Sequence, residues 1–247
     1  MLKRVISASV MFPVVLLLLW SGSIYRNLFI LCITAILLGE WNYVCYQAAR
    51  PSTQKWIWAT AGSAYIVLGC SGFWFVGKGT NWLWQLYLIC TVAASDTGAY
   101  FVGKFFQGPK LAPSISPNKT WSGSVGGIVC TILVGLPLFL FNLLPLKITS
   151  GPFADVFFCI VRGIFWEAPW WFLIQIIFLQ ISLSITAQIG DLMESWVKRR
   201  LDVKDTSQLI PGHGGLLDRV DGLLLVSIIA GGLLGTGYFL HLLYSHT

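Results

Sequence analysis

Uncharged apolar runs of about twenty residues, the length of a membrane-spanning helix, are the feature that most limits the folds open to this chain. The run from Pro169 to Gly190 contains no charged residue. Segments such as VVLLLLW, from Val14 to Trp20, do not alternate polar and apolar residues as the strands of an outer-membrane barrel do. Only 11% of all residues are charged, against about 25% in a soluble domain. The sequence therefore predicts an all-α, polytopic integral membrane protein.

About seven transmembrane helices are predicted from these runs, within a range of about six to nine. The segment 153–166 (FADVFFCIVRGIFW) is short and contains Arg162. Its structure stays open between a re-entrant or interfacial helix and part of one long tilted span. No internal repeat or soluble domain is present, so residues 1–247 are expected to form a single catalytic membrane domain. The predicted helices lie near residues 5–22, 27–46, 56–76, 81–99, 124–144, 169–190 and 222–243.

The basic residues predict which side of the membrane each loop faces. A cytoplasmic N-terminus leaves most of the sixteen Lys and Arg residues in the cytoplasm, as the positive-inside rule requires. The same topology places two polar loops, near 96–123 and 190–222, on the cytoplasmic side of an inner (plasma) membrane. The net charge of +6 is dispersed among the loops, which suits anionic membrane lipids and argues against nucleic acid as a partner. The four basic residues outside would be Arg26, Lys78, Lys147 and Arg162.

A polar segment from Gly190 to Gly222 contains six of the ten acidic residues and five of the sixteen basic ones. Such charge density between two apolar runs is unfavourable beside a membrane and therefore indicates function. If the preceding helix continues past Gly190, four polar residues share one of its faces at spacings i, i+3, i+4 and i+7. These residues are Asp191, Glu194, Ser195 and Lys198.

Asp218 and Asp221 are also three residues apart, at the start of the last predicted span. Two carboxylates in this relation repel each other unless a cation lies between them. Hard oxygen ligands on neighbouring helices suit Mg²⁺, which usually takes one or two carboxylates together with substrate phosphates. The glycine-rich loop from Pro211 to Gly215 would let backbone N–H groups approach an anion closely. The segment therefore predicts a divalent metal ion and a phosphate-bearing ligand.

The first polar loop carries a second set of candidates. Asp96 lies near the end of an apolar run, and an ionisable residue there is a functional candidate by default. Lys119 precedes several Ser and Gly residues and could hold a phosphate or a sugar edge, although no Walker A motif is present. Pro113 and Pro117 are expected to break regular structure in this loop. An ordinary interfacial connection is the alternative. Glu40, inside an early span, stays open between lining a polar cavity and hydrogen bonding across helices.

Both loops resemble the phosphatidate cytidylyltransferases, also called CDP-diglyceride synthases. The C-terminal signature runs through Ser195-Trp-Val-Lys198-Arg199, Lys204-Asp205, Pro211-Gly-His213-Gly214-Gly215 and Asp218-Arg219-Val-Asp221. Three further segments are similar to family motifs: Asp96-Thr97-Gly98-Ala99-Tyr100, Ile115-Ser116-Pro117-Asn118-Lys119-Thr120 with Gly123, and Gly190-Asp191. The earlier spans resemble the family only in hydropathy.

The resemblance implies an enzyme that transfers a cytidylyl group from CTP to phosphatidic acid, giving CDP-diacylglycerol and pyrophosphate. It also implies roles for individual residues. Mg²⁺ would be bound by Asp191, Asp218 and Asp221, with Asp96 as a secondary candidate. The phosphates of CTP or phosphatidate would contact Lys119, Lys198, Lys204 and Arg219. The triphosphate would lie in the loop of Gly212, His213, Gly214 and Gly215, and Ser195 would supply a hydrogen bond.

Two other functions are compatible with parts of the pattern. A membrane lipid or polyprenol kinase that uses CTP as phosphoryl donor would share the need for phosphate and metal sites. A transporter would also carry intramembrane charge, but transporters bind substrate near the bilayer midplane, whereas the charges of this chain gather at one interface. The sequence leaves the oligomeric state open, a homodimer included.

Overall fold

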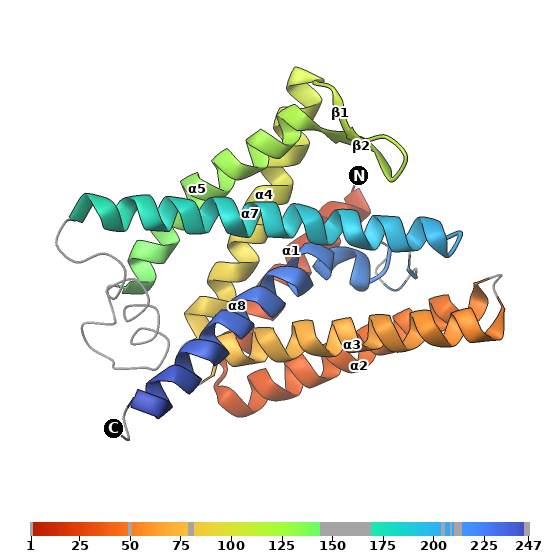
Figure 1. Cartoon of the computed structure of the whole chain (residues 1–247), viewed down its shortest axis with the longest axis horizontal. Coiled ribbons are helices and arrows are strands. Elements are labelled where there is room, and N and C mark those ends of the chain that lie inside the picture. The colour runs from red at the N-terminus through yellow and green to blue at the C-terminus, as the bar shows by residue number, and fades with distance from the viewer. Residues whose placement is uncertain are drawn as a thin grey trace.

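Seven α-helices and one short hairpin make up the part of the chain that the computed structural model describes (Figure 1). The described residues are 2–48, 51–78, 82–143, 169–203, 206–207, 209 and 214–244. The helices are α1 (Leu2–Trp20), α2 (Ser23–Gln47), α3 (Ser52–Val76), α4 (Trp82–Phe106), α5 (Trp121–Leu143), α7 (Pro169–Arg200) and α8 (Leu217–Tyr244). The strands are β1 (Lys110–Ala112) and β2 (Ser116–Thr120).

These helices coincide with the seven predicted spans, and five of them are long and apolar enough to cross a membrane. The prediction of an all-α, polytopic membrane protein is confirmed. Two helices run well past their predicted C-terminal ends, since α4 continues to Phe106 and α7 to Arg200. With 32 residues, α7 is about 48 Å long at 1.5 Å per residue, so it extends well past a hydrocarbon core of about 30 Å. The segment 153–166 lies outside the described residues.

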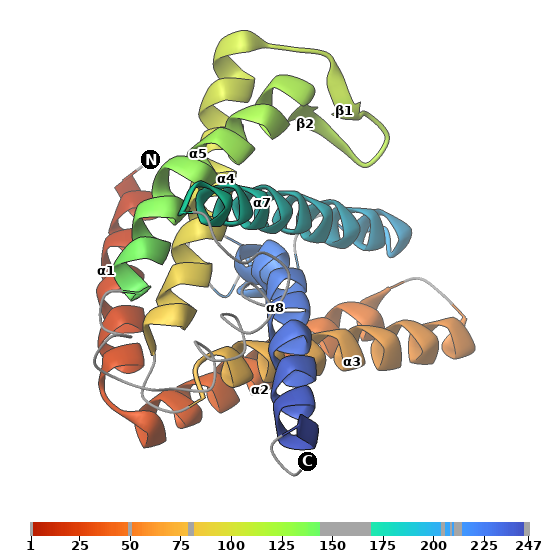
Figure 2. The same ribbon diagram turned by 60° about the vertical axis from the view of Figure 1, so that its left-hand side comes forward.

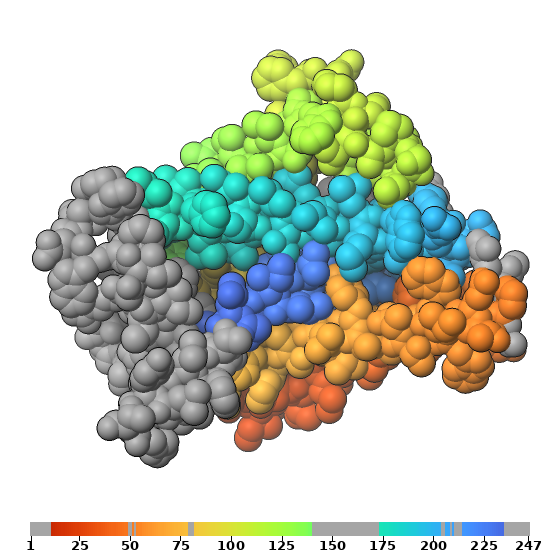
Figure 3. All heavy atoms as spheres, viewed as in Figure 1, coloured from red at the N-terminus to blue at the C-terminus, as the bar shows by residue number. Residues whose placement is uncertain are grey.

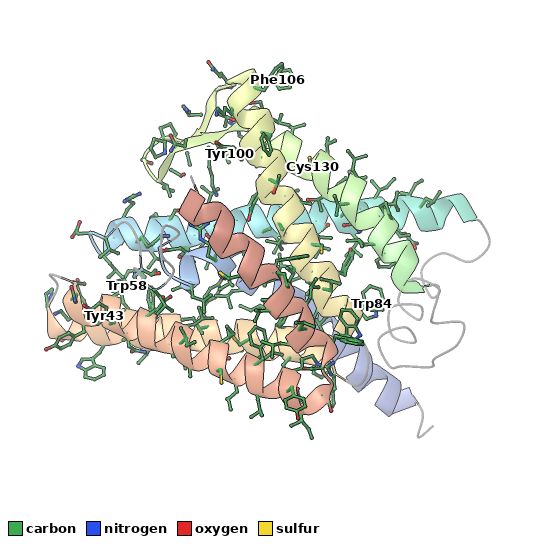
Figure 4. All side chains as sticks on the ribbon, turned by 180° about the vertical axis from the view of Figure 1, so that it is seen from behind. Tyr43, Trp58, Trp84, Tyr100, Phe106 and Cys130 are labelled. Atoms are coloured by element: carbon green, nitrogen blue, oxygen red, sulfur yellow. The ribbon has the colours of Figure 1, made fainter. Side chains whose placement is uncertain are left out.

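The helices pack closely because small residues face each other at their crossings. A Cβ atom added to Gly98 of α4 would lie 2.5 Å from Cβ of Cys130 on α5, and one added to Gly126 of α5 would lie 2.3 Å from Cβ of Val102. In a bilayer, such approach of two backbones replaces the hydrophobic effect as a source of helix association. Figure 4 shows Cys130 at the side of α4, and Trp84 and Phe106 near opposite ends of that helix.

The hairpin between α4 and α5 differs from the predicted irregular connection. Its strands are antiparallel, with Lys110 opposite Thr120 and Ala112 opposite Ser116. Pro113 lies in the turn, as a helix- and strand-breaking residue should, but Pro117 lies inside β2. The register shifts between Lys110 and Ala112, opposite the part of β2 that contains Pro117, so Pro117 lies where the pairing is irregular but does not end the strand. In a two-stranded sheet both strands are edge strands, where a missing N–H is tolerated.

The long helix α7 packs against α5 and the hairpin as well as against α8. It crosses the face shown in Figure 3 between α5 and the hairpin on one side and α3 on the other. Figure 2 shows the hairpin beyond the adjoining ends of α4 and α5, on the side of α7. This arrangement brings the first polar loop, 96–123, against the charged C-terminal third of α7.

Candidate active site

The site is built where the charged part of α7 meets the first turns of α8. The two backbones touch there, because a Cβ added to Gly222 would lie 2.9 Å from the carbonyl oxygen of Ala187. A Cβ added to Gly190 would likewise lie 3.0 Å from the carbonyl oxygen of Asp221. Asp191 directly follows one of these glycines and Asp221 directly precedes the other. The glycine contact therefore sets the two carboxylates on adjoining helices.

Asp191 connects α7 to the hairpin. Its Oδ2 lies 2.5 Å from Nζ of Lys119 on β2, and its Oδ1 accepts a hydrogen bond of 3.4 Å from the hydroxyl of Ser195. The exposed fractions of the Lys119 and Asp191 side chains are 23% and 32%, so both remain accessible to a ligand. This ion pair brings together the two polar loops that the sequence predicts to share a site.

Lys198 lies at the centre of a more buried ion-pair network. Its Nζ donates a hydrogen bond of 2.8 Å to Oδ1 of Asp218 and lies 3.2 Å from Oε1 of Glu194. The predicted helical face from Asp191 to Lys198 is thus confirmed. Glu194 was not assigned a role from the sequence, although its spacing of four residues from Lys198 is the signal that points to it.

Asp218 is held by several protein donors. Besides Lys198, its Oδ2 accepts hydrogen bonds from the backbone N–H groups of Gly215, at 2.9 Å, and Thr206, at 3.1 Å. The contact with Gly215, three residues before it, resembles the carboxylate half of a capping box at the start of α8. In this arrangement Asp218 orders the chain that enters α8.

The glycine-rich loop is only partly described. Gly214 has φ of +86°, a conformation that favours glycine, and the N–H of Gly215 is engaged by Asp218. A Cβ added to Gly215 would lie 2.0 Å from Oγ1 of Thr206, so the chain passes close to that residue. Lys204, Gly212 and His213, which the sequence predicts to contact phosphates, lie outside the described residues.

Glu40, on α2, accepts hydrogen bonds from the residues that lead into α8. Its Oε1 accepts hydrogen bonds from the hydroxyl of Ser207, at 2.5 Å, and from the backbone N–H of Leu216, at 3.0 Å. Its Oε2 accepts one from the N–H of Leu217, at 2.9 Å. Of the two roles left open by the sequence, hydrogen bonding across helices is the one observed. The partners are backbone groups at a helix N-terminus, where a negative charge also interacts favourably with the helix dipole.

Several carboxylates of the site lie within electrostatic range of one another. Asp221 experiences the negative charges of Asp191, Glu194 and Asp96, in decreasing order. Both carboxylate oxygens of Glu194 are buried and accept no hydrogen bond, although Lys198 is within ion-pair distance. Asp96 in turn lies within electrostatic range of Lys119 and Arg219.

Carboxylate oxygens are the type of ligand that a divalent cation such as Mg²⁺ takes. Carboxylates of like charge that lie near one another favour a divalent cation between them. Among the described residues, no group of three or more Asp, Glu, His or Cys side chains is clustered tightly enough to hold a metal ion alone. The residues therefore fit a metal whose remaining ligands come from water and from the phosphates of a substrate.

Fold and site together define a polytopic membrane protein whose carboxylates and basic side chains meet where α7 packs against α8 and the hairpin. A model of the family described as "Cytidylyltransferase family" matches residues 43–235. The chain belongs to this family, which confirms the resemblance seen in the sequence.

Individual relatives support the same assignment, two of those named below over 92% of this chain. A phosphatidate cytidylyltransferase of Brucella suis biovar 1 (strain 1330) is 31% identical, over 92% of this chain and 90% of its own length. One of Rickettsia conorii (strain ATCC VR-613 / Malish 7) is 34% identical, over 92% of this chain and 87% of its own. One of Staphylococcus haemolyticus (strain JCSC1435) is 35% identical, over 66% of this chain and 53% of its own.

Proposed function

We propose that the protein transfers the cytidylyl group of CTP to phosphatidic acid. An oxygen of the phosphatidate phosphate attacks the α-phosphorus of CTP and forms a new P–O bond. The bond from that phosphorus to the oxygen bridging to the β-phosphate breaks, and pyrophosphate leaves with that electron pair. The product is CDP-diacylglycerol. The observation that carries the proposal is the ion pair of Lys119 and Asp191, which joins the two motifs of the family resemblance in one site.

The proposed chemistry demands positioning and charge neutralisation more than a strong base, because the attacking phosphate is already ionised. Lys119 and Arg219 border the carboxylates and are proposed to hold substrate phosphates. Lys198 is proposed to act mainly by orienting Glu194 and Asp218, since both already surround its ammonium group. Ser195 is proposed to fix the orientation of Asp191 through its hydrogen bond.

Mg²⁺ is the proposed cofactor, with Asp191 and Asp221 as ligands and Asp96 and Glu194 near enough to assist. When bound, it would neutralise phosphate charge near the attacking and leaving oxygens. Asp218 is retained as a weaker metal candidate, because its oxygens already accept hydrogen bonds from Lys198, Gly215 and Thr206. The whole chain is proposed to act as one catalytic membrane domain.

The proposed location is the inner (plasma) membrane with the site facing the cytoplasm. The distribution of Lys and Arg supports this orientation. It also meets a requirement of the reaction, because CTP is a cytoplasmic solute whereas phosphatidate lies in the leaflet. Both substrates can reach a site at the interface between membrane and cytoplasm.

The test uses purified protein, phosphatidate, Mg²⁺ and CTP labelled either in the cytosine or in the γ-phosphate. Transfer of the cytosine label to the lipid phase, with γ-label released as pyrophosphate, is the expected result. Movement of γ-label into lipid would instead identify a CTP-dependent kinase and overturn the proposal. Absence of both transfers in a protein that is correctly folded would overturn it too.

A further inference from the structure

A narrow apolar groove begins at the candidate active site and runs between the helices. Its volume is about 350 Å³, and its walls come from α1, α2, α3, α4 and α8. Arg219 is the one charged residue among those that line it. The remaining lining side chains are almost all aliphatic or aromatic, as in a site that receives a hydrocarbon ligand.

The polar end of the groove adjoins the carboxylates of the site. Arg219 directly follows Asp218 in α8 and lies within electrostatic range of Asp96. From Leu216, just before α8, to Ser227 the groove follows the chain over eleven residue steps, which is about 16 Å at 1.5 Å per residue. It therefore leads from the phosphate-binding region into the apolar interior of the helix assembly.

The rim of the groove on α1 is open. Met11 and Val14 line it and are 36% and 46% exposed. In a protein that spans a bilayer, exposed aliphatic side chains of this kind face lipid chains. A ligand can therefore enter sideways from the membrane with its polar part directed at Arg219.

We infer that this groove binds an acyl chain of the phosphatidate acceptor, with the lipid phosphate placed beside Arg219. The inference rests on the proposed function and specifies how the lipid substrate is held. Charge complementarity favours an anionic lipid, because the polar end carries a guanidinium group.

The groove predicts a dependence on chain length. Each methylene group buried from water raises affinity about fourfold, so long-chain phosphatidate should gain more from the groove than a short-chain analogue. A bulky residue in the groove should remove this advantage. Val15→Trp fills the groove from α1, whereas Leu17→Trp changes the same helix at an exposed position outside the lining.

The first experiment measures kcat/KM for dioleoyl and dihexanoyl phosphatidate at saturating CTP. A steric cost of about 1.4 kcal/mol in binding the acyl chain corresponds to a tenfold loss of kcat/KM. We expect Val15→Trp to lose about tenfold on the dioleoyl acceptor, to change less than about threefold on the dihexanoyl one, and to leave the KM for CTP unaltered. Equal losses on both acceptors, or the same behaviour in Leu17→Trp, would overturn the groove assignment.

A second experiment does not depend on turnover. Wild-type protein in phosphatidylcholine vesicles is irradiated with phosphatidate that carries a diazirine in its acyl chain, and the labelled residues are mapped. We expect the label to be concentrated on the groove residues of α1 and α8. Unlabelled phosphatidate should reduce this labelling by competition. Labelling spread evenly over lipid-facing residues would overturn the groove even if cytidylyl transfer is observed. Groove labelling without any transfer would instead indicate that the proposed reaction is wrong and the lipid site is present.

Discussion

The carboxylate of Glu40 accepts a hydrogen bond of 2.9 Å from the backbone N–H of Leu217, the first residue of α8. Glu40 belongs to α2, so a side chain 177 residues earlier in the sequence caps the helix that carries Asp218 and Asp221. The first four N–H groups of a helix have no partner within it. A buried carboxylate that satisfies two of them fixes both the position of the helix end and the direction of the acidic side chains that follow.

Glu40→Ala should therefore destabilise the protein and impair the site together. The N–H groups of Leu216 and Leu217 would lose their acceptor, and an unsatisfied buried donor costs about 1–3 kcal/mol. We expect a decrease in Tm of about 5–10 °C, measured by thermal unfolding in detergent. Asn42→Ala removes only solvent-exposed hydrogen bonds, one of them to Ser63 of α3, so it is the matched control and should lower Tm by less than about 2 °C. An unchanged Tm in Glu40→Ala would show that water replaces the carboxylate.

Much of this architecture was predictable from local sequence patterns. The contacts of Glu40 were not. The apolar runs predict the seven described helices because each run has the length of a membrane span. The spacing from Asp191 to Lys198 predicts their shared face because a helix repeats every 3.6 residues. No local pattern links Glu40 to Leu217, since the contact depends on how α2, α3 and α8 pack.

The same limit applies to individual site residues. Asp218 and Asp221 look equivalent in the sequence, yet Asp218 is surrounded by donors whereas Asp221 faces other carboxylates. The difference arises from the course of the chain around Thr206. Pro117 likewise predicts a break in regular structure, and only the partner strand shows that it lies inside β2 beside a shift in register.

Gly222→Ala should separate α7 from α8. The added Cβ would lie 2.9 Å from the backbone oxygen of Ala187, which cannot move aside as a flexible side chain could. A displacement of about 1 Å between the carboxylates on the two helices is expected to lower kcat about 100-fold. Gly232→Ala, further along α8, is the control, because its Cβ would meet no atom within 4 Å. Equal activity of the two variants would contradict the role of this contact.

Lys119 and Asp191 should act as a coupled pair. Lys119→Ala and Asp191→Ala are each expected to lower kcat/KM about 100-fold, because the hairpin loses its link to α7 and the site loses a charged group. The double variant should be little worse than either single variant, since residues that act as a unit are strongly non-additive. Lys110→Ala removes the same charge from the same hairpin and should change kcat/KM less than about threefold. Fully multiplicative losses in the double variant would show that the two residues act independently.

Asp221→Asn and Asp218→Asn should have different effects on Tm. Asp221 lies among negative charges, so its neutralisation relieves repulsion and should leave Tm unchanged or higher, while Mg²⁺-dependent turnover is lost. Asp218 accepts hydrogen bonds from Lys198 and two backbone N–H groups. Its replacement leaves the charge of Lys198 poorly compensated and should lower Tm.

A titration of Tm with Mg²⁺ separates these two effects without relying on activity. A metal that binds only the folded protein stabilises it by about 2.7 kcal/mol at one hundred times its Kd. Wild-type protein and Asp218→Asn should both show an increase in Tm as Mg²⁺ is added, whereas Asp221→Asn should show almost none. If Asp218→Asn instead loses the Mg²⁺-dependent increase and Asp221→Asn keeps it, the metal lies beside Asp218. The hydrogen bonds that Asp218 makes to Gly215 and Thr206 would then have to open when the metal binds.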